Sequence, residues 1–347
     1  MPNELKNILI MKPSALGDIV LALPALAALR KSFPNAKISW FVKPEFAPLL
    51  ENHPYLDEII LFDRRHLSKA LSNTKAFGSL YSLIEQLRKQ KFDAVFDFQG
   101  LFRSAFISWL SGCKKRYGIA NSREFAHIFY TDKIEHNMDC IHLVDLYLKV
   151  VQTAGAKIDN AEFLIPSNQA DVDSVKKLLN KNGLESGKYI VLIPGSAQES
   201  KCWPVERFAQ LADKISEQFN YPIIAVGTKA EKNKAEEINN LAKTDVINLA
   251  GQTSLKELIE LLRIAKLVVS NDTGPGHIAS VISVPLVIMY SWSNPARIAP
   301  YGRHECMVAR DPFTRGMEIK SNNPNHSITK ITVEEVFQKA SEQLKKK

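Results

Sequence analysis

The residues from Leu267 to Ala279 (LVVSNDTGPGHIA) combine side chains and backbone features that could bind an anion. Their apolar, β-branched start predicts a buried strand, and the glycines predict a sharp turn into a helix that begins at Asp272 or Thr273. Backbone N–H groups at a helix start point at one spot and suit a phosphate, which His277 could also reach. Any parallel α/β protein can join a strand to a helix in this way. The turn alone is therefore as consistent with an ordinary strand-to-helix connection as with a phosphate site.

The other polar residues that could carry chemistry share one property, which is that each lies beside the end of a predicted strand. In the first half of the chain these are Ser14, Gly17, Asp18, Arg64, Arg65, Asp97, Gln99 and Arg103, and in the second half Ser196, Gln198, Lys201, Glu231, Thr253, Asp272 and His277. Ligands of open α/β sheets bind at the carboxyl ends of the strands. We therefore expect these side chains to face a cleft.

Asp18 and Lys201 carry the most specific hypotheses, each beside a plainer alternative. Asp18 could be a general base, or it could cap the helix that follows it, which contributes ~1 kcal/mol of stability. Lys201 could hold a phosphate, or it could be a solvated surface lysine. A charge-assisted bond to a phosphate would contribute roughly 1.5–3 kcal/mol, compared with ~0.3–1 kcal/mol for an exposed helix end. Arg64 and Arg65 could bind an anionic second substrate or be surface charge.

Several familiar motifs are absent from the sequence. No GxGxxG follows the first predicted strand, which weakens a dehydrogenase interpretation, and no GxxxxGK[ST] marks a P-loop ATPase. The sequence also has no HExxH and no DxD-like acidic cluster, so we expect chemistry without a tightly held metal or other cofactor.

Strands alternate with helices along the chain, which predicts parallel sheets with crossover helices. The first half has predicted strands at 7–11, 38–42, 58–62 and 94–98, and helices at 19–31, from 45, at 79–89, after 100 and at 141–153. After a linker at 155–168, strands are predicted at 189–193, 222–226, 246–249, 267–269 and 285–289, and helices at 171–179, 205–218, 230–241, 255–264 and 333–345. We expect two doubly wound α/β domains facing a cleft, at residues 1–160 and 161–330, followed by a terminal helix at 331–347.

The composition fits a globular protein with two domains. The 347 residues are 45% hydrophobic and exceed one ordinary core, and the apolar run 19–29 is expected to be a buried helix rather than a signal peptide. Four scattered cysteines predict a reduced cytosolic protein without a zinc site. The net charge of +8 is spread over both halves, which argues against a nucleic-acid partner and favours anionic substrates, an anionic membrane surface or simple solubility.

Several widely spaced motifs together resemble the glycosyltransferase family that includes the lipopolysaccharide heptosyltransferases. They are KPSALGD at 12–18, FDAVFDFQGL at 92–101, KCWP at 201–204 and DTGPGH at 272–277. Residues 291–302 resemble a further loop of the family, although Tyr290-Ser291-Trp292 stands where glycine is usual. The resemblance covers nearly the whole chain and implies a GT-B fold, in which two Rossmann-like domains bind acceptor and nucleotide sugar.

The resemblance also implies roles for individual residues. Asp18 would take the proton from the acceptor hydroxyl, so that the product has inverted stereochemistry. The donor ADP-heptose would be bound by Ser196, Ala197, Lys201, Glu231, Thr253, Asp272, Thr273, Gly274 and His277. The Kdo-containing inner core of lipid A would be bound by Arg64, Arg65 and Arg123. These partners imply a cytoplasmic protein, peripheral on the cytosolic face of the inner membrane, and the motifs favour transfer of the first heptose over the second.

Three other interpretations remain open at this stage. A transferase of the same family could use another nucleotide sugar or acceptor. A GT-B-like nucleotide-sugar epimerase would convert the donor without any acceptor. A non-catalytic nucleotide-binding protein would need Lys201 but would have no use for Asp18.

Overall fold

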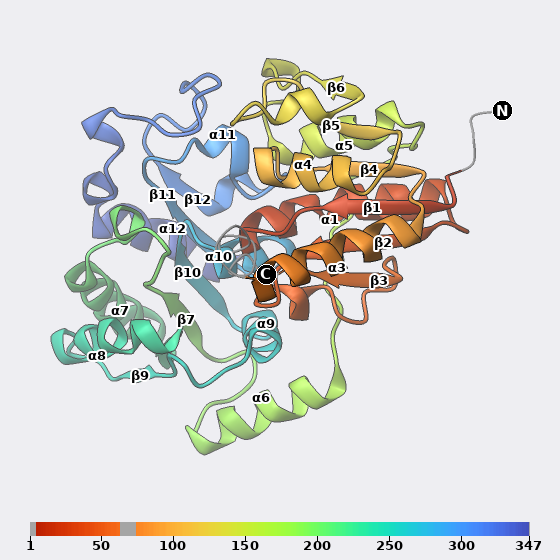
Figure 1. Ribbon diagram of the computed structural model, residues 1–347. Coiled ribbons are helices and arrows are strands. Elements are labelled where there is room, and N and C mark those ends of the chain that lie inside the picture. The colour runs from red at the N-terminus through yellow and green to blue at the C-terminus, as the bar shows by residue number, and fades with distance from the viewer. Residues whose placement is uncertain (1–4, 63–73, 347) are drawn as a thin grey trace. The chain divides into compact units, whose positions relative to one another are not determined.

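The computed structural model describes residues 5–62 and 74–346, and the chain divides into two compact units, Met1–Pro166 and Ser167–Lys347 (Figure 1). Each unit holds one parallel six-stranded sheet with crossover helices. Within the described ranges, no helix is both long and apolar enough to cross a membrane. Two Rossmann-like sheets confirm the predicted GT-B class of fold.

The first unit has the strand order β3-β2-β1-β4-β5-β6. Its strands are β1 (Asn7–Met11), β2 (Lys37–Val42), β3 (Glu58–Leu61), β4 (Ala94–Asp97), β5 (Arg116–Ile119) and β6 (Asp132–Ile134), and its α-helices are α1 (Leu16–Ser32), α3 (Thr74–Gln90), α4 (Phe102–Leu110) and α5 (Leu143–Thr153). Helix α1 packs against α5 and is buried from Ile19 to Leu29, Pro24 included. The apolar run 19–29 is therefore a buried helix, as its sequence predicts.

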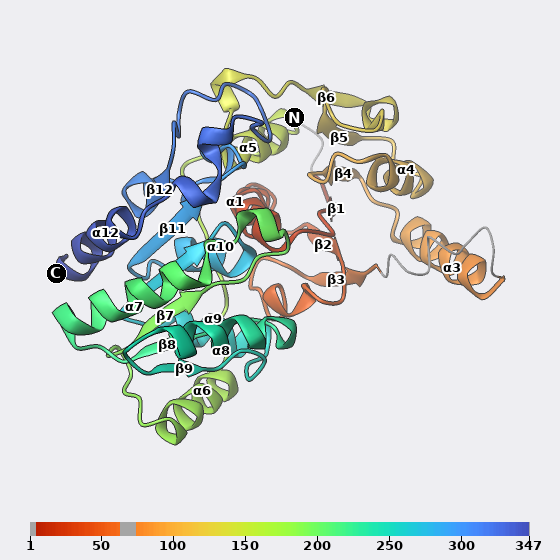
Figure 2. The ribbon, with the colours of Figure 1, turned by 90° about the vertical axis from the view of Figure 1, so that its left-hand side faces the viewer.

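The second unit has the strand order β12-β11-β10-β7-β8-β9. Its strands are β7 (Ile190–Ile193), β8 (Ile223–Ala225), β9 (Val246–Asn248), β10 (Leu267–Asn271), β11 (Leu286–Tyr290) and β12 (Met307–Ala309). Its α-helices are α6 (Gln169–Lys181), α7 (Val205–Phe219), α8 (Lys232–Leu241), α9 (Leu255–Arg263), α10 (Gly274–Val281), α11 (Pro295–Ile298) and α12 (Val333–Lys345). Figure 2 shows α7 and α8 side by side near β9, and α12 packs against α7 and β11.

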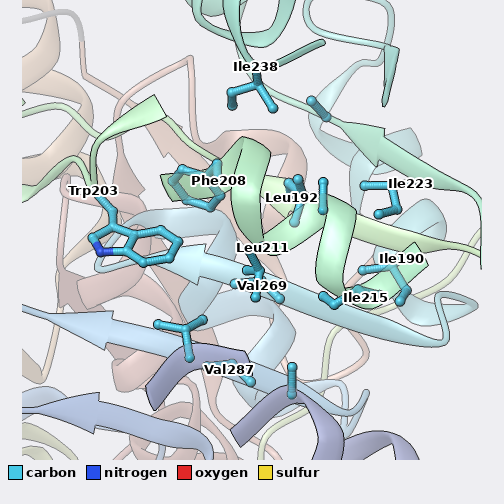
Figure 3. Packing of buried hydrophobic residues seen from close by; sticks show 14 of the residues in the cluster. Ile190, Leu192, Trp203, Phe208, Leu211, Ile215, Ile223, Ile238, Val269 and Val287 are labelled. Carbon is cyan, nitrogen blue, oxygen red and sulfur yellow. The ribbon is translucent and has the colours of Figure 1, made fainter. Parts of the chain in front are cut away.

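A continuous apolar core holds the second sheet to its helices. Trp203 and Phe208 meet edge to face with ring centroids 5.1 Å apart, and Leu211 packs with them against Val269 of β10 (Figure 3). The terminal helix joins the same core through Val336 and Ala340. Burying an aliphatic side chain of this size stabilises a fold by ~1.5–3 kcal/mol, so α12 is integral to this unit.

The segment that leads to the second unit is bound to the first. The Lys157 amide donates to Ser32 Oγ at 2.8 Å, Tyr55 Oη donates to Glu162 at 2.6 Å, and Leu164 O lies 3.1 Å from His53 Nε2. Lys31 also pairs with Glu162. These bonds explain why the units divide after Pro166, a few residues beyond the predicted position.

Some local expectations differ from the structure. Strands β5, β6 and β12 are not predicted, because they have only three or four residues each, and β5 and β6 also include charged ones. Asp18 is not the N-cap of α1, because the helix begins at Leu16 with Ala15 as its N-cap, but its carboxylate accepts from the Ala15 amide and so takes part in capping from the third helical position. Thr273, rather than Asp272, is the N-cap of α10, and its side chain makes no capping bond.

Candidate active site

The turn between β10 and α10 has the form predicted for an anion site. Strand β10 is buried throughout, and α10 begins directly after Thr273. A Cβ on Gly276 would lie 2.6 Å from Ser270 Oγ and 3.1 Å from Asn271 O, so only glycine lets the helix approach the strand so closely. The first-turn amides have no partner inside the helix, and Pro275 sits where its lack of an N–H costs nothing.

Asp272 is the centre of a buried ionic cluster at this turn. Its carboxylate lies 2.6 Å from Lys201 Nζ and 3.2 Å from His277 Nε2, and its side chain is only 4% exposed. Burial raises the pKa of Asp272, but the hydrogen bond from His277 and the charge of Lys201 outweigh burial, and the net pKa is well below the usual range. The carboxyl is therefore ionised in the folded protein.

Lys201 keeps capacity for a ligand. Its ammonium group has three donors, and Asp272 takes one of them. The side chain is 16% exposed, so it is partly shielded from water, where a charge-assisted bond is stronger. The histidine of the cluster has its Nδ1 buried without a partner among the described residues.

The loop after β7, which carries Ser196 and Lys201, is fastened to the end of β10. Asn271 accepts from the Trp203 amide at 3.0 Å and donates to Pro194 O at 2.8 Å. Ser196 Oγ donates to Asp272 O at 3.4 Å. Ala197, next along the loop, is exposed. One side chain, Asn271, therefore holds the two strand ends together and sets the position of Lys201.

Glu231 lies at the neighbouring strand ends. Its carboxylate accepts from the Thr228 amide at 2.6 Å and from Thr228 Oγ1 at 2.9 Å. A Cβ on Gly195 would lie 1.6 Å from Glu231 Oε1, and a Cβ on Gly227 would lie 2.8 Å from Oε2. The glycines after β7 and β8 thus make room for this carboxylate. Thr253 follows β9, one residue before the N-cap of α9.

The predicted donor residues therefore share one edge of the second sheet. Strands β10, β7, β8 and β9 are neighbours, and all four run parallel. The donor candidates that follow the carboxyl ends of these strands are Ser196, Ala197, Lys201, Glu231, Thr253, Asp272, Thr273, Gly274 and His277.

Asp18 lies in the first unit, one turn into α1 after β1. Its side chain is 38% exposed, and its Oδ2 accepts from the Ala15 amide at 3.4 Å. Lys12 Nζ lies 3.3 Å from the same oxygen and donates to Phe98 O at 3.2 Å. The Lys12 side chain is only 3% exposed, yet its pKa is raised: burial lowers it, but the charge of Asp18 and contacts with Tyr147 outweigh burial.

Lys12 is the functional candidate that the sequence interpretation did not single out. Lys12 is the first residue of the KPSALGD motif, so the sequence places it six residues before Asp18. Its pairing with Asp18 depends on the turn that brings residue 18 back over the strand end, and on Phe98 from another strand. Neither contact follows from spacing along the chain.

Asp97 at the end of β4 is a second buried carboxylate. It accepts from the amides of Gln99 and Gly100 at 2.9 and 3.2 Å, and from the hydroxyls of Ser104 and Tyr130, each at 2.8 Å. Burial raises its pKa despite these bonds. Asp97 therefore fixes the loop after β4 through the four hydrogen bonds that it accepts.

That loop lines a pocket at the carboxyl edge of the first sheet. The polar lining residues are Ser14, Lys43, Gln99, Arg103, Ser104 and Glu124. Gln99 Oε1 accepts from the Ser14 amide at 3.3 Å, which links the ends of β4 and β1. Arg123, exposed and adjacent to Glu124, follows β5. Arg64 and Arg65 lie outside the described residues.

In the parts of the chain that the structure describes, no three His, Cys, Asp or Glu side chains converge as a metal site would require.

Two Rossmann-like units, each with one parallel six-stranded sheet, define the GT-B class of fold, and the second unit carries an ionic cluster of Lys201, Asp272 and His277 at one sheet edge. Solved structures agree on the fold. The glycosyl transferase family 9 structure from Veillonella parvula has a TM-score of 0.83 at 24% identity, covering 99% of this chain and 98% of that one. Escherichia coli heptosyltransferase WaaC with ADP-2-deoxy-2-fluoro heptose has a TM-score of 0.73 at 24% identity, covering 97% and 99%.

Sequence comparison gives the family. The profile of glycosyltransferase family 9 (heptosyltransferase) matches residues 80–328, so the chain belongs to this family of glycosyltransferases. Lipopolysaccharide heptosyltransferase 1 of Campylobacter coli is 31% identical over 298 residues, 82% of this chain and 83% of that protein. Lipopolysaccharide core heptosyltransferase OpsX of Haemophilus influenzae is 27% identical over 308 residues, 88% and 84% of the two chains.

Proposed function

We propose that this protein transfers heptose from ADP-heptose to the Kdo inner core of lipopolysaccharide and that it adds the first heptose. The observation that carries the proposal is the cluster of Lys201, Asp272 and His277 at the start of α10, in a chain of the heptosyltransferase family. The related proteins from Campylobacter coli and Escherichia coli are named heptosyltransferase 1, which supports first transfer.

The donor would bind at the carboxyl edge of the second sheet. Lys201, Ser196 and the amides near Ala197 and Gly274 hold the diphosphate, where negative charge grows as the bond to the sugar breaks. A charge-assisted bond contributes roughly 1.5–3 kcal/mol, against ~0.3–1 kcal/mol for the helix end, so Lys201 is the larger contributor.

The remaining donor residues would select the nucleoside and the sugar. Glu231 and Thr253 follow the ends of β8 and β9. By family resemblance, these two residues would lie near the adenosine. Asp272 and His277 face the heptose and the phosphates. Asp272 is ionised and can accept hydrogen bonds from sugar hydroxyls.

The acceptor chemistry would use Asp18 of the first unit. Asp18 removes the proton from an acceptor hydroxyl, and that oxygen attacks the anomeric carbon from the face opposite the diphosphate. The bond from the anomeric carbon to the phosphate oxygen breaks, ADP leaves with the electron pair, and the configuration is inverted. Lys12 fixes the Asp18 carboxylate through its ion pair, while Arg123, with Arg64 and Arg65, binds the anionic acceptor.

The acceptor also suggests where the protein works. Lipid A precursors lie in a bilayer, and a net charge of +8 suits an anionic membrane surface. We therefore propose a cytoplasmic protein that associates peripherally with the inner membrane.

Mass spectrometry of products from purified protein, ADP-heptose and Kdo₂-lipid A tests the proposal. A product heavier than the acceptor by one heptose is expected, with UDP- and GDP-sugars inactive. Asp18→Asn should lose kcat by about 10²–10⁴-fold with donor affinity kept. Lys201→Ala should raise the donor KM and also lower kcat, because charge on the leaving group peaks in the transition state.

Other outcomes would identify the rival functions. Heptose conversion without acceptor would indicate an epimerase, and turnover with another nucleotide sugar would indicate a different donor within the family. Full activity of a folded Asp18→Asn variant with confirmed acceptor binding would refute the general-base role.

A further inference from the structure

The first unit exposes an aromatic surface that the proposed chemistry does not use. Phe102, Phe106 and Trp109 lie on one face of α4, and Phe129 of the following 3-10 helix completes the cluster. Phe106 and Phe129 are 5.6 Å apart between ring centroids, and Trp109 and Phe129 are 6.2 Å apart. Ile128 and Phe125 are exposed and lie close to Phe129 along the chain, and we include them with the cluster in what we call the α4 aromatic face.

Four of these side chains are far more exposed than their size would predict. Phe102 is 44% exposed, Trp109 49%, Ile128 60% and Phe125 74%. Single exposed apolar residues are ordinary, but neighbouring large ones usually mark an interaction surface. Phe125 also has a left-handed backbone with φ of 57°, which is uncommon for a bulky residue and presents its ring at the loop tip.

The chain segment that carries the α4 aromatic face is predominantly basic. From residue 101 to 131 the chain has five basic side chains and one acidic side chain. Arg116 is committed to Phe129 O at 2.7 Å, whereas Arg103, Lys114, Lys115 and Arg123 are exposed. Aromatic side chains surrounded by cations fit a bilayer interface with anionic headgroups, where rings enter the interface and cations stay at the phosphates.

The α4 aromatic face is continuous in the chain with the pocket at the carboxyl edge of the first sheet, which we take as the acceptor pocket. Phe102 precedes Arg103, which lines the pocket, and Phe125 follows Glu124, which also lines it. A substrate carried on a lipid would therefore be presented beside the residues that bind its sugar.

We propose that the α4 aromatic face docks the enzyme on an anionic lipid bilayer, with Trp109, Phe125 and Ile128 entering the interface and Lys114 and Lys115 at the headgroups. The inference rests on the proposed function only for the nature of the acceptor, because lipid binding itself is measured without substrate. A protein partner or a second copy of this chain are alternative occupants, and the test separates them.

The experiment pairs vesicle binding with turnover of a soluble acceptor. Vesicles of phosphatidylcholine alone and with about 30% phosphatidylglycerol are pelleted with wild type, Trp109→Ser/Ile128→Ser and Lys114→Gln/Lys115→Gln. The apolar pair should lower the partition coefficient by about tenfold or more on both vesicles, and the lysine pair should remove the preference for phosphatidylglycerol. Both should keep wild-type kcat/KM on a deacylated Kdo saccharide.

Matched controls keep the result interpretable. Phe313→Ser removes an aromatic side chain of similar exposure, 55%, from the second unit and should bind vesicles like wild type. Because Trp109 contacts the ring cluster, Phe125→Asn/Ile128→Ser repeats the test with two more exposed residues, and asparagine tolerates the left-handed backbone.

Each remaining outcome refutes one statement. Unchanged vesicle binding in both apolar pairs would overturn the membrane proposal, as would an equal loss in Phe313→Ser. A wild-type dimer that the apolar pairs dissociate, without vesicle binding, would assign the face to a second copy. Vesicle binding by a wild type that does not turn over the soluble acceptor would refute the proposed function and leave the docking surface standing.

Discussion

Asp97 and Asp272 occupy corresponding places in the two units, and their surroundings give them opposite properties. Each lies at the end of the central strand next to the first strand of its sheet, β4 beside β1 and β10 beside β7. Both side chains are almost fully buried. Asp97 is surrounded by hydroxyls and amides, whereas Asp272 is held by Lys201 and His277.

The partners decide the direction in which the pKa of each carboxyl is shifted. Burial raises the pKa of Asp97, and neutral donors do not offset it. At Asp272 burial acts in the same direction, but the histidine bond and the lysine charge bring the pKa well below normal. Corresponding positions on the two sheets thus hold a carboxyl fixed by neutral donors in one unit and an ionised carboxylate paired with a lysine in the other.

Replacing each of the two carboxylates by its amide should give the largest difference in activity between the two units. Asp272→Asn removes the charge that orients Lys201 and His277, and we expect kcat/KM to fall by about 10²–10³-fold. Asp97→Asn can still accept from the Gln99 and Gly100 amides and donate to a hydroxyl, so most activity should remain. Initial rates with saturating acceptor measure both.

Two results would contradict this asymmetry. An active Asp272→Asn enzyme would remove the ionic cluster from the mechanism. A large loss of kcat in a folded Asp97→Asn enzyme would show that the first carboxylate acts in the chemistry.

The glycine after β7 should give the next largest effect, since the corresponding turn after β1 has no glycine. An added methyl in Gly195→Ala would overlap Glu231 Oε1, and relief of such overpacking costs about 1–3 kcal/mol. We expect ADP to bind roughly tenfold or more weakly by calorimetry. Gly78→Ala in α3, where nothing lies within 4 Å of the new Cβ, is the control and should leave binding unchanged.

The two carboxyls should also contribute to stability with opposite pH dependence. The folded state raises the pKa of Asp97 above the unfolded value of 3.8, so its contribution is favourable at low pH and is lost as pH rises through the folded pKa. The contribution of Asp272 is present above about pH 4 and is lost as pH falls below it, because the folded pKa is lowered.

Hydrogen-exchange mass spectrometry of peptides from β4 and β10, in wild type and in each amide variant, measures these slopes. Relative to wild type, Asp97→Asn should gain stability as pH rises from 4. Parallel slopes in the two variants would contradict the assignment of charge.

His53 should give the smallest effect, confined to the first unit. Burial lowers its pKa, and the bond to Leu164 O and the Glu162 charge only partly offset this. The neutral ring is therefore favoured in the folded state, and stability is lost as pH falls below the unfolded value of about 6.5. In His53→Gln this loss should disappear, measured as the change in melting temperature between pH 7 and pH 5. An undiminished acid dependence would assign it to other groups.

The main elements and the donor edge followed from the sequence because they depend on local pattern. Apolar, β-branched runs such as 267–269 specify buried strands, and the glycines at 274 and 276 specify the turn. The parallel order then brings Lys201 and His277 to one edge without any knowledge of side-chain contacts.

What the sequence could not predict depends on contacts between distant segments. The fastening of Asp97 by Tyr130, the pairing of Lys12 with Asp18, and the placement of Glu231 against Gly195 each join separate strand ends. The strands β5, β6 and β12 are too short for a sequence pattern to be recognised, since neighbours in the sheet supply most of their stability.

Asn271 and Trp203 have a consequence for how the protein is handled. Asn271 joins β7 to β10, and Trp203 Nε1, in turn, donates to Ile331 O at 2.9 Å, just before α12. The loop that carries Lys201, the proposed nucleotide-binding residue, is thereby connected to the last helix, which lies far along the chain from it. A truncation or a bulky carboxyl-terminal tag that lifts α12 would be recorded as weak nucleotide affinity, although no tail residue need touch the nucleotide.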